Sequence, residues 1–177
     1  AKFMEITHEA YRREVGAHFG KTIPGIFTDE PNPGPVFREW FDNDGGDVSI
    51  AWTPRFPEQF QKMFGYDISD HLPEIAYDVT GQVLSRPRYH YHHCKCRLFV
   101  EAFARPMGQW CQENHLLFTG HTLLEEPGSD NLTMGAAHMQ FYPYMQAPGI
   151  DVLTEFERIY ITAKQCVSVA HQTGRKW

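Results

Sequence analysis

The chain has 177 residues, and 42% of them are hydrophobic, which is enough to form the core of one folded domain. Its formal net charge is -6 and it contains no run of Lys or Arg, which argues against a nucleic-acid partner and against an anionic membrane surface. No stretch approaches the roughly 20 apolar residues of a membrane span, and the N-terminal residues AKFMEITHEA lack the features of a signal peptide.

The first predicted elements are a helix and a strand. Apolar residues recur at helical spacing over residues 3–19, and Gly20 ends the helix. The run TIPGIFT (22–28) then predicts a strand, whose near-continuous apolar character is typical of a strand buried on both faces of a parallel sheet. Asp29 and Glu30 follow it directly, at a place where an acidic side chain has no role in a core.

Residues 31–85 are predicted to form a helical and irregular insertion after this strand. The first part of the insertion is rich in Pro, Gly, Asn and Asp, which favours a loop. Two short helices are expected next. The first begins at Thr53 or Pro57 and ends at Gly65, and the second is capped by Ser69.

A longer helix is expected from about residue 88 to residue 114, with a kink at Pro106. Its first part, YHYHHCKC (89–96), alternates His and Cys, whereas a structural zinc site needs ligand pairs separated by a turn. We therefore interpret this segment as an exposed polar helix start. The four cysteines are few and irregularly spaced, so they are expected to be reduced thiols.

The rest of the chain continues to alternate strands and helices. A strand and its exit loop are predicted in HLLFTGHTLLEE (115–126), a helix in 131–149, a short strand in IDVL (150–153) and a helix in 160–175. This order predicts an α/β fold: a segment of a (β/α)8 TIM-type barrel with about three parallel strands, in which residues 1–177 form one partial catalytic domain. Because three strands leave both edges of a buried sheet bare, the remainder of the barrel is the expected partner.

Polar residues follow or lie in each predicted strand, and in an α/β barrel the carboxyl ends of the strands form the active site. Neither FTDEP nor GHTLLEEPGSD contains Lys or Arg, which an ordinary solvated face would include. A structural interpretation of each single residue stays open: an acid caps a turn, is solvated on a loop or pairs with an Arg. Jointly the pattern favours a functional site, and its members are Asp29, Glu30, His121, Glu125, Glu126 and Asp151.

Paired carboxylates without a phosphate-binding loop, a nucleophilic Ser elbow or a Gly-rich dinucleotide turn favour glycoside hydrolysis. This reaction needs one carboxylic acid that protonates the leaving oxygen and a second carboxylate on the opposite face of the sugar. The acid needs a raised pKa, which desolvation by Phe27, Trp52 and nearby aromatic side chains would supply.

Five stretches of the chain are GIFTDEP, FPEQFQKMFGYDISDHLP, GQWCQENHLLFTGHTLLEE, YMQAPGIDVL and AKQCVSVAHQTGR. In this order they resemble the catalytic barrel of bacterial α-L-rhamnosidase-like glycoside hydrolases, glycoside hydrolase family one hundred and six. FTDEP is also similar to the Asn-Glu-Pro strand end that carries the acid in many barrel glycosidases, with Asp29 in place of the Asn. The resemblance covers most of the chain from Gly25 to Arg175.

The resemblance implies an enzyme that removes terminal α-L-rhamnose from a carbohydrate substrate by inversion, with an active-site Ca²⁺ ion. Glu30 matches the acid position, and Glu126 or Glu125 matches an acidic rim position that is the base or a calcium ligand. We expect catalysis by Glu30 and Glu126, and the calcium ligands are not assigned. The residues expected to bind substrate are Asp29, Trp52, His121, Glu125, Asp151 and His171.

Alternatives stay open for the identity of the catalytic base and for the class of reaction. Family members continue past AHQTGR into a strand that ends in another glutamate, and if that residue is the base, the chain as given holds half of the catalytic pair and is inactive. A second hypothesis is a non-catalytic carbohydrate-binding barrel fragment. A third is a metal-dependent hydrolase that uses His121, Asp151 and His171, although their spacing does not match a zinc site.

Overall fold

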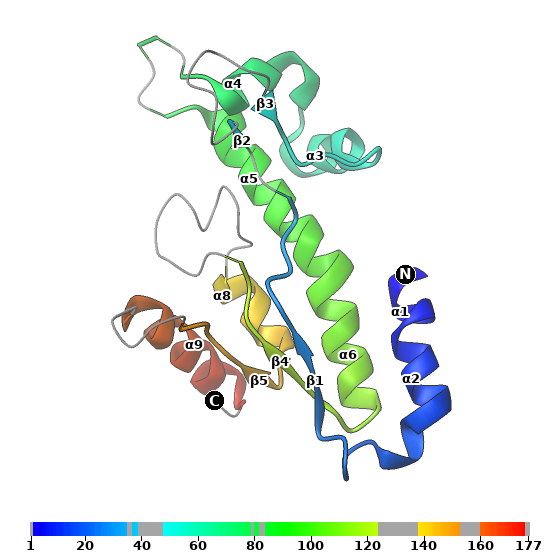
Figure 1. Ribbon diagram of the computed structural model, residues 1–177. Helices are drawn as coiled ribbons and strands as arrows, with labels where there is room; N and C mark the ends of the chain where they lie inside the picture. The colour runs from blue at the N-terminus through cyan, green and yellow to red at the C-terminus, as the bar shows by residue number, and fades with distance from the viewer. Residues whose placement is uncertain are drawn as a thin grey trace.

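A parallel sheet of three short strands organises the part of the chain that contains the predicted site (Figure 1). The computed structural model describes residues 2–34, 37–38, 48–78, 80–81, 84–123, 138–152 and 160–175. The strands are β1 (Gly25–Thr28), β4 (Leu117–Gly120) and β5 (Ala147–Pro148), in the spatial order β1-β4-β5. Both pairings are parallel, so the predicted α/β class is confirmed, and the arrangement is compatible with part of an α/β barrel.

The predicted position of the third strand is wrong. The strand is Ala147–Pro148, and its pairing with β4 ends at the hydrogen bond of 3.0 Å from the Gly149 N–H to the Gly120 carbonyl. Residues 150–152 are not part of the sheet. Just before β5, the side chain of Gln146 bonds to the backbone of β4. Its Oε1 atom accepts a hydrogen bond of 2.9 Å from the backbone N–H of Phe118. The described part of the apolar run that suggested a strand in 150–153, residues 150–152, therefore follows the sheet and does not belong to it.

The first strand is not buried on both faces. Ile26 packs against the main core, but Phe27 on the opposite face is 62% exposed. Successive side chains of a strand point to opposite faces, so only one face of β1 is covered by described residues. The apolar run around β1 therefore does not indicate burial on both sides here.

Two N-terminal helices replace the single helix expected over residues 3–19. They are α1 (Lys2–Ile6) and α2 (His8–Val15), followed by a short 3₁₀ turn over Gly16–His18. Thr7 separates them, and both its backbone N–H and its hydroxyl donate to the carbonyl of Phe3, at 3.0 and 2.8 Å. The pair is attached to the rest of the protein by Trp110, whose Nε1–H donates to the Glu9 carboxylate at 2.8 Å.

The insertion contains short elements that pack on one long helix. They are the antiparallel strands β2 (Phe37–Arg38) and β3 (Val48–Ser49), the helices α3 (Phe56–Phe64) and α4 (Leu72–Ala76), and the 3₁₀ turn Ile68–His71. As predicted, α3 has Pro57 in its first turn and ends at Gly65. The next turn is capped by Asp67 and not by Ser69, because the Asp67 carboxylate accepts from the Ser69 N–H at 2.8 Å.

The long helix runs as α5 (Arg86–Phe99), the π-helical turn η3 (Val100–Ala104) and α6 (Arg105–Glu113). In η3 the N–H of Arg105 donates to the carbonyl of Val100, five residues back. Pro106 explains this irregularity, because it has no N–H and its ring would clash with the carbonyl four residues earlier in an α-helix. The predicted kink is therefore a π turn.

The expectation of an exposed polar start for this helix is wrong. Residues 91, 92 and 94–96 are buried, and Tyr91 and Cys94 form a core with Phe56, Phe60 and others from the insertion. Tertiary packing of α3 and α4 on α5 provides the burial that the polar composition of 89–96 did not indicate. All four cysteines are buried free thiols, which confirms that they are reduced.

A second core lies between the sheet and its helices. It includes Phe118 of β4, Cys111 of α6 and Cys166 of α9 (Tyr160–Thr173), and it extends to α8 (His138–Phe141) and the 3₁₀ turn Tyr142–Tyr144. The last helix, α9, agrees closely with the helix predicted over residues 160–175. Within the ranges that the structure describes, no helix is long and apolar enough to cross a membrane.

Candidate active site at the carboxyl ends of the strands

The register of the sheet brings the residues after each strand together. Thr28 of β1 pairs with Gly120 of β4, and Gly120 pairs with Pro148 of β5. The ladder extends one bond further, because the N–H of His121 donates to the carbonyl of Thr28 at 3.2 Å. Asp29 and His121 are therefore neighbours at the same edge of the sheet.

Gly120 permits this close approach of β1 and β4. Its φ is +124°, a conformation that side chains rarely adopt, and a Cβ atom at this position would meet the backbone oxygen and nitrogen of Thr28. The glycine in the sequence FTGHT is therefore needed both for its backbone conformation and for its lack of a side chain. The sequence pattern around FTGHT did not predict this role.

Asp29 and His121 form the central contact of the site. Oδ1 of Asp29 lies 3.1 Å from Nε2 of His121, and the ring of Phe27 packs edge-on to the imidazole, with 5.7 Å between centroids. The His121 side chain is 10% exposed and that of Asp29 is 77% exposed. One partner is thus fixed in the protein and the other faces solvent.

The two imidazole nitrogens of His121 differ in their surroundings, because Nε2 lies at ion-pair distance from the Asp29 carboxylate and Nδ1 is buried. Nδ1 of His121 and the hydroxyl of Thr122 are both buried, and no described residue provides either with a hydrogen-bond partner. Unsatisfied buried polar atoms next to an exposed carboxylate are typical of a site that binds a polar ligand.

Glu30 adopts a strained backbone conformation beside this pair. Its φ of 45° lies in the left-handed region, which costs a non-glycine residue roughly 1–2 kcal/mol. The turn after it is held by Asn32, whose Nδ2 donates to the Glu30 carbonyl at 3.1 Å and whose Oδ1 accepts from the N–H of Gly34 at 3.0 Å. The exposed Glu30 side chain is therefore directed by a defined turn at the strand end.

The other predicted site residues lie at different places. Asp151 is three residues beyond the end of β5, at the same edge of the sheet as Asp29, and is partly buried. His171 is exposed in the last turn of α9, and a helix that follows a parallel strand runs back toward the opposite edge. Trp52 packs on Phe56 with the two rings tilted by 30° and 5.0 Å between their centroids, beside a separate cavity.

Glu125 and Glu126 lie outside the described residues, and the pairing of Glu30 with Glu126 stays a prediction. The described residues contain no group of three or more His, Cys, Asp or Glu side chains that could hold a metal ion. Calcium takes six to eight oxygen ligands, and the described part of the rim does not supply them. The calcium ion therefore stays a prediction, and no step is assigned to it.

Sequence reasoning also missed Lys95, a buried cation on α5. A signal for its burial was present. Tyr91 and Leu98 lie four positions before and three positions after Lys95, so the three side chains share one face of a helix. That face was not recognised because the histidines and cysteines around it suggested a polar surface.

Comparison with known proteins gives one solved structure. No family model matches the chain, and no curated protein sequence matches it. The structure of a rhamnosidase from Novosphingobium sp. PP1Y is similar to this chain, with a TM-score of 0.50 and 24% sequence identity over 74% of the chain. The match covers 13% of that rhamnosidase chain. The described fold is therefore similar to a part of a rhamnosidase.

Proposed function

We propose that this chain is part of the catalytic domain of a glycoside hydrolase that removes terminal α-L-rhamnose by inversion, with Glu30 as the general acid. The observation that carries the proposal is the position of Glu30 beside the Asp29–His121 contact at the carboxyl ends of parallel strands. The sequence resemblance and the similarity of fold to a rhamnosidase support the choice of sugar.

In this proposal Glu30 protonates the glycosidic oxygen. The residue directly follows β1, and its strained backbone is held by the Asn32 turn, which limits the directions that its carboxyl group can take. Strain at a defined position is a frequent property of active-site residues, because the surrounding structure supplies the energy that maintains it.

Asp29 and His121 hold the sugar. The Asp29 carboxylate lies 3.1 Å from Nε2 of His121 and has further acceptor positions for sugar hydroxyl groups. Nδ1 of His121 and the hydroxyl of Thr122 are available to a hydroxyl that enters the site. Hydrogen bonds to buried polar atoms of this kind reject ligands that lack the matching hydroxyl.

The base is Glu126 or a glutamate beyond Trp177. In an inverting enzyme the two carboxyl groups are about 6.5 to 9.5 Å apart, which leaves room for the attacking water molecule. A separation near 5 Å would instead favour a retaining mechanism. Nuclear magnetic resonance of the first sugar released distinguishes the two, because inversion of an α-rhamnoside yields β-rhamnose.

The leaving group provides the test of Glu30. In the protein expressed from its complete gene, Glu30→Gln should lower the turnover of an alkyl rhamnoside by about 10²- to 10⁴-fold, the usual contribution of a general acid. Turnover of 2,4-dinitrophenyl rhamnoside should fall much less, since this leaving group departs without protonation. The matched control is Glu5→Gln, which makes the same chemical change on the exposed side of α1.

Equal losses on both substrates, or no loss on either, would remove Glu30 from the role of acid. Calorimetry with a rhamnoside distinguishes the proposed enzyme from the alternative of a non-catalytic domain. Binding without any hydrolysis by the wild-type protein would favour a non-catalytic carbohydrate-binding domain.

A further inference from the structure

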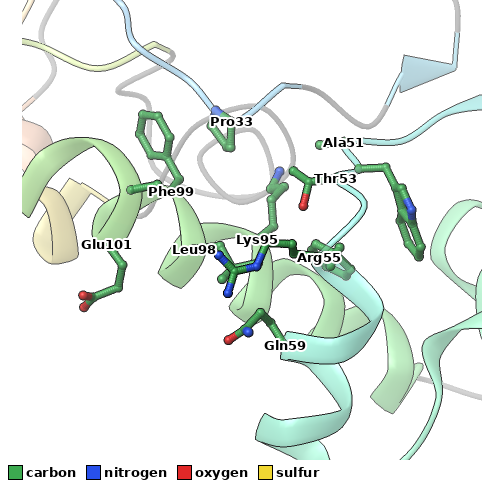
Figure 2. A pocket seen from close by; sticks show the side chains of 12 residues that line it. Pro33, Ala51, Thr53, Arg55, Gln59, Lys95, Leu98, Phe99 and Glu101 are labelled. Atoms are coloured by element: carbon green, nitrogen blue, oxygen red, sulfur yellow. The ribbon is translucent and has the colours of Figure 1, made fainter. Parts of the chain in front are cut away.

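A cavity of about 490 Å³ lies apart from the Asp29–His121 contact, between α3, the long helix and the segment around Ala51 (Figure 2). Its volume is in the range of pockets that bind small molecules. Most of the residues that line it are apolar, which is also typical of such pockets. The apolar members of the lining include Pro33, Trp52, Phe56, Leu98, Phe99 and Ala102.

Trp52 forms an aromatic wall of the cavity, and its backbone is fixed on both sides. Its side chain stays 40% exposed although it packs on Phe56. Before it, the carbonyl of Ala51 accepts a hydrogen bond of 2.7 Å from the hydroxyl of buried Tyr91. After it, the carbonyl of Thr53 accepts one of 2.9 Å from the N–H of Phe56. The exposed indole is therefore a preformed surface for a ligand.

Phe99 borders the cavity from the long helix, and its ring is also held in place. The ring stacks on Phe103, with 5.4 Å between centroids and an interplanar angle of 7°, and it packs on Phe141 at 5.7 Å. Aromatic side chains attract an aromatic ring more than a saturated ring of similar size, because the face and the edge of such a ring carry opposite partial charges. Two fixed aromatic walls therefore favour an aromatic ligand.

The charged groups of the lining do not favour a charged ligand. The carboxylate of Glu101 is paired with Arg105 at 2.9 Å and, in Figure 2, points away from the segment that carries Pro33. Lys95 is buried and already interacts with another residue of the chain. Arg55 is exposed, so water solvates its guanidinium group. An uncharged ligand therefore suits this lining best, because a buried charge needs a partner.

The cavity lies close to the proposed acid. Pro33 is part of the turn after β1, in which Asn32 bonds to the carbonyl of Glu30 and to the N–H of Gly34. Pro33 follows Glu30 by three residues, so their Cα atoms are no more than about 11 Å apart at about 3.6 Å per residue. The turn that holds Glu30 therefore also holds one wall of the cavity. Two fused rings on a short chain are long enough to cover a distance of this order.

We propose that this cavity binds the leaving group of the glycoside, and that this leaving group carries an uncharged, flat aromatic ring system. The assignment as a leaving-group site rests on the proposed glycosidase function, in which Glu30 protonates the oxygen between the sugar and the leaving group. The preference for an uncharged aromatic ring rests only on the lining, above all on Trp52 and Phe99.

Two alcohols that differ in aromaticity test the binding preference in the complete protein without any turnover. They are 2-naphthylethanol and its saturated counterpart, decahydro-2-naphthylethanol. Ligand-observed nuclear magnetic resonance should show about 3- to 10-fold tighter binding of the aromatic alcohol, the range expected for contacts between aromatic rings. Burial of apolar surface alone would give the opposite order, since the saturated alcohol is the more hydrophobic one. Equal affinities, tighter binding of the saturated alcohol or no binding of either would overturn the proposal.

Variants locate the site. Trp52→Ala should weaken the binding of 2-naphthylethanol by about 10-fold and that of the saturated alcohol less. Ala102→Phe should weaken both, because Ala102 is exposed at the cavity and the larger side chain would occupy part of its volume. The control Tyr11→Ala removes a 54% exposed ring from α2, which contributes none of the described residues of the lining, and should change neither affinity.

Unchanged affinities in folded Trp52→Ala and Ala102→Phe would refute the assignment to this cavity. If one of the two variants does not fold, the other decides, and if neither folds, the wild-type measurements decide.

The link to catalysis is tested separately with the α-L-rhamnosides of the same two alcohols. Both alcohols are alkyl leaving groups of similar acidity, so a difference in kcat/KM reports binding of the ring and not its ability to leave. The wild-type enzyme should prefer the aromatic rhamnoside by about 3- to 10-fold, and Trp52→Ala should reduce this preference.

The outcomes separate the two proposals. Hydrolysis of both rhamnosides without a preference would overturn the leaving-group assignment alone. Binding of 2-naphthylethanol together with no hydrolysis of any rhamnoside would instead contradict the glycosidase function and leave the aromatic site in place.

Discussion

Replacement of Gly120 by alanine tests whether the close approach of β1 and β4 builds the site. The added Cβ atom would meet the backbone oxygen and nitrogen of Thr28, the residue that precedes Asp29. These are main-chain atoms of a neighbouring strand and do not move aside as a flexible side chain does. The two strands must separate at the end where Asp29 and His121 meet.

The expected loss of stability has two parts. A non-glycine residue at a φ of +124° costs about 1–3 kcal/mol in backbone strain. Separation of the strands also weakens the hydrogen bond from the His121 N–H to the Thr28 carbonyl, which contributes about 1 kcal/mol. The free energy of unfolding should therefore fall by about 2–4 kcal/mol in total, as measured by urea denaturation followed by circular dichroism.

Gly65→Ala is the matched control. Gly65 also has a positive φ, +81°, but an added Cβ atom would have no neighbour within 4 Å. This variant should lose only the strain term, about 1 kcal/mol. A Gly120→Ala variant that is no less stable than Gly65→Ala would refute the argument, because the contact with Thr28 would then have no measurable cost.

Two further predictions concern strain and protonation. Glu30→Gly should increase the free energy of unfolding by about 0.5–1 kcal/mol, because the relief of left-handed strain exceeds the conformational entropy that glycine loses on folding. The variant should also abolish hydrolysis. A loss of stability would contradict the strain at Glu30. Burial lowers the pKa of His138 from 6.5 to about 4, so the unfolded chain binds more protons between these values. The contribution of neutral His138 to the free energy of unfolding is fully present above pH 6.5. This free energy falls by about 3 kcal/mol as the pH drops to about 4. His138→Gln should flatten the dependence of stability on pH in this window, and equal slopes in the two proteins would show that His138 is not responsible.

The sequence predicted the order of strands and helices because the spacing of apolar residues differs between the two kinds of element. TIPGIFT and HLLFTG are apolar runs of strand length with helical patterns between them, and they form β1 and β4 as expected. The same reasoning failed for IDVL. Its pattern is also strand-like, but the strand lies earlier, at Ala147–Pro148, directly after Gln146, whose side chain bonds to β4. A side-chain contact of this kind has no local signature in the sequence.

The candidate site was predicted in part. The rule that strand ends meet at one edge of a parallel sheet was sufficient to bring Asp29 and His121 together. The sequence did not predict that Nε2 of His121 faces Asp29, because this depends on the register between Thr28 and Gly120. It also did not predict the cavity, since burial of Lys95 requires helices that are far apart in the sequence to pack on one another.

The π turn sets the rotation of α5 relative to α6 by a single residue position. A π turn is equivalent to one extra residue in an α-helix, and each residue of an α-helix advances it by about 100°. A deletion of one residue in 100–104, combined with replacement of Pro106, would restore a regular helix and rotate the face of α5 that packs on α3 and α4 by about this angle relative to α6. The length of this turn therefore aligns the core of the insertion with the core of the sheet on one helix.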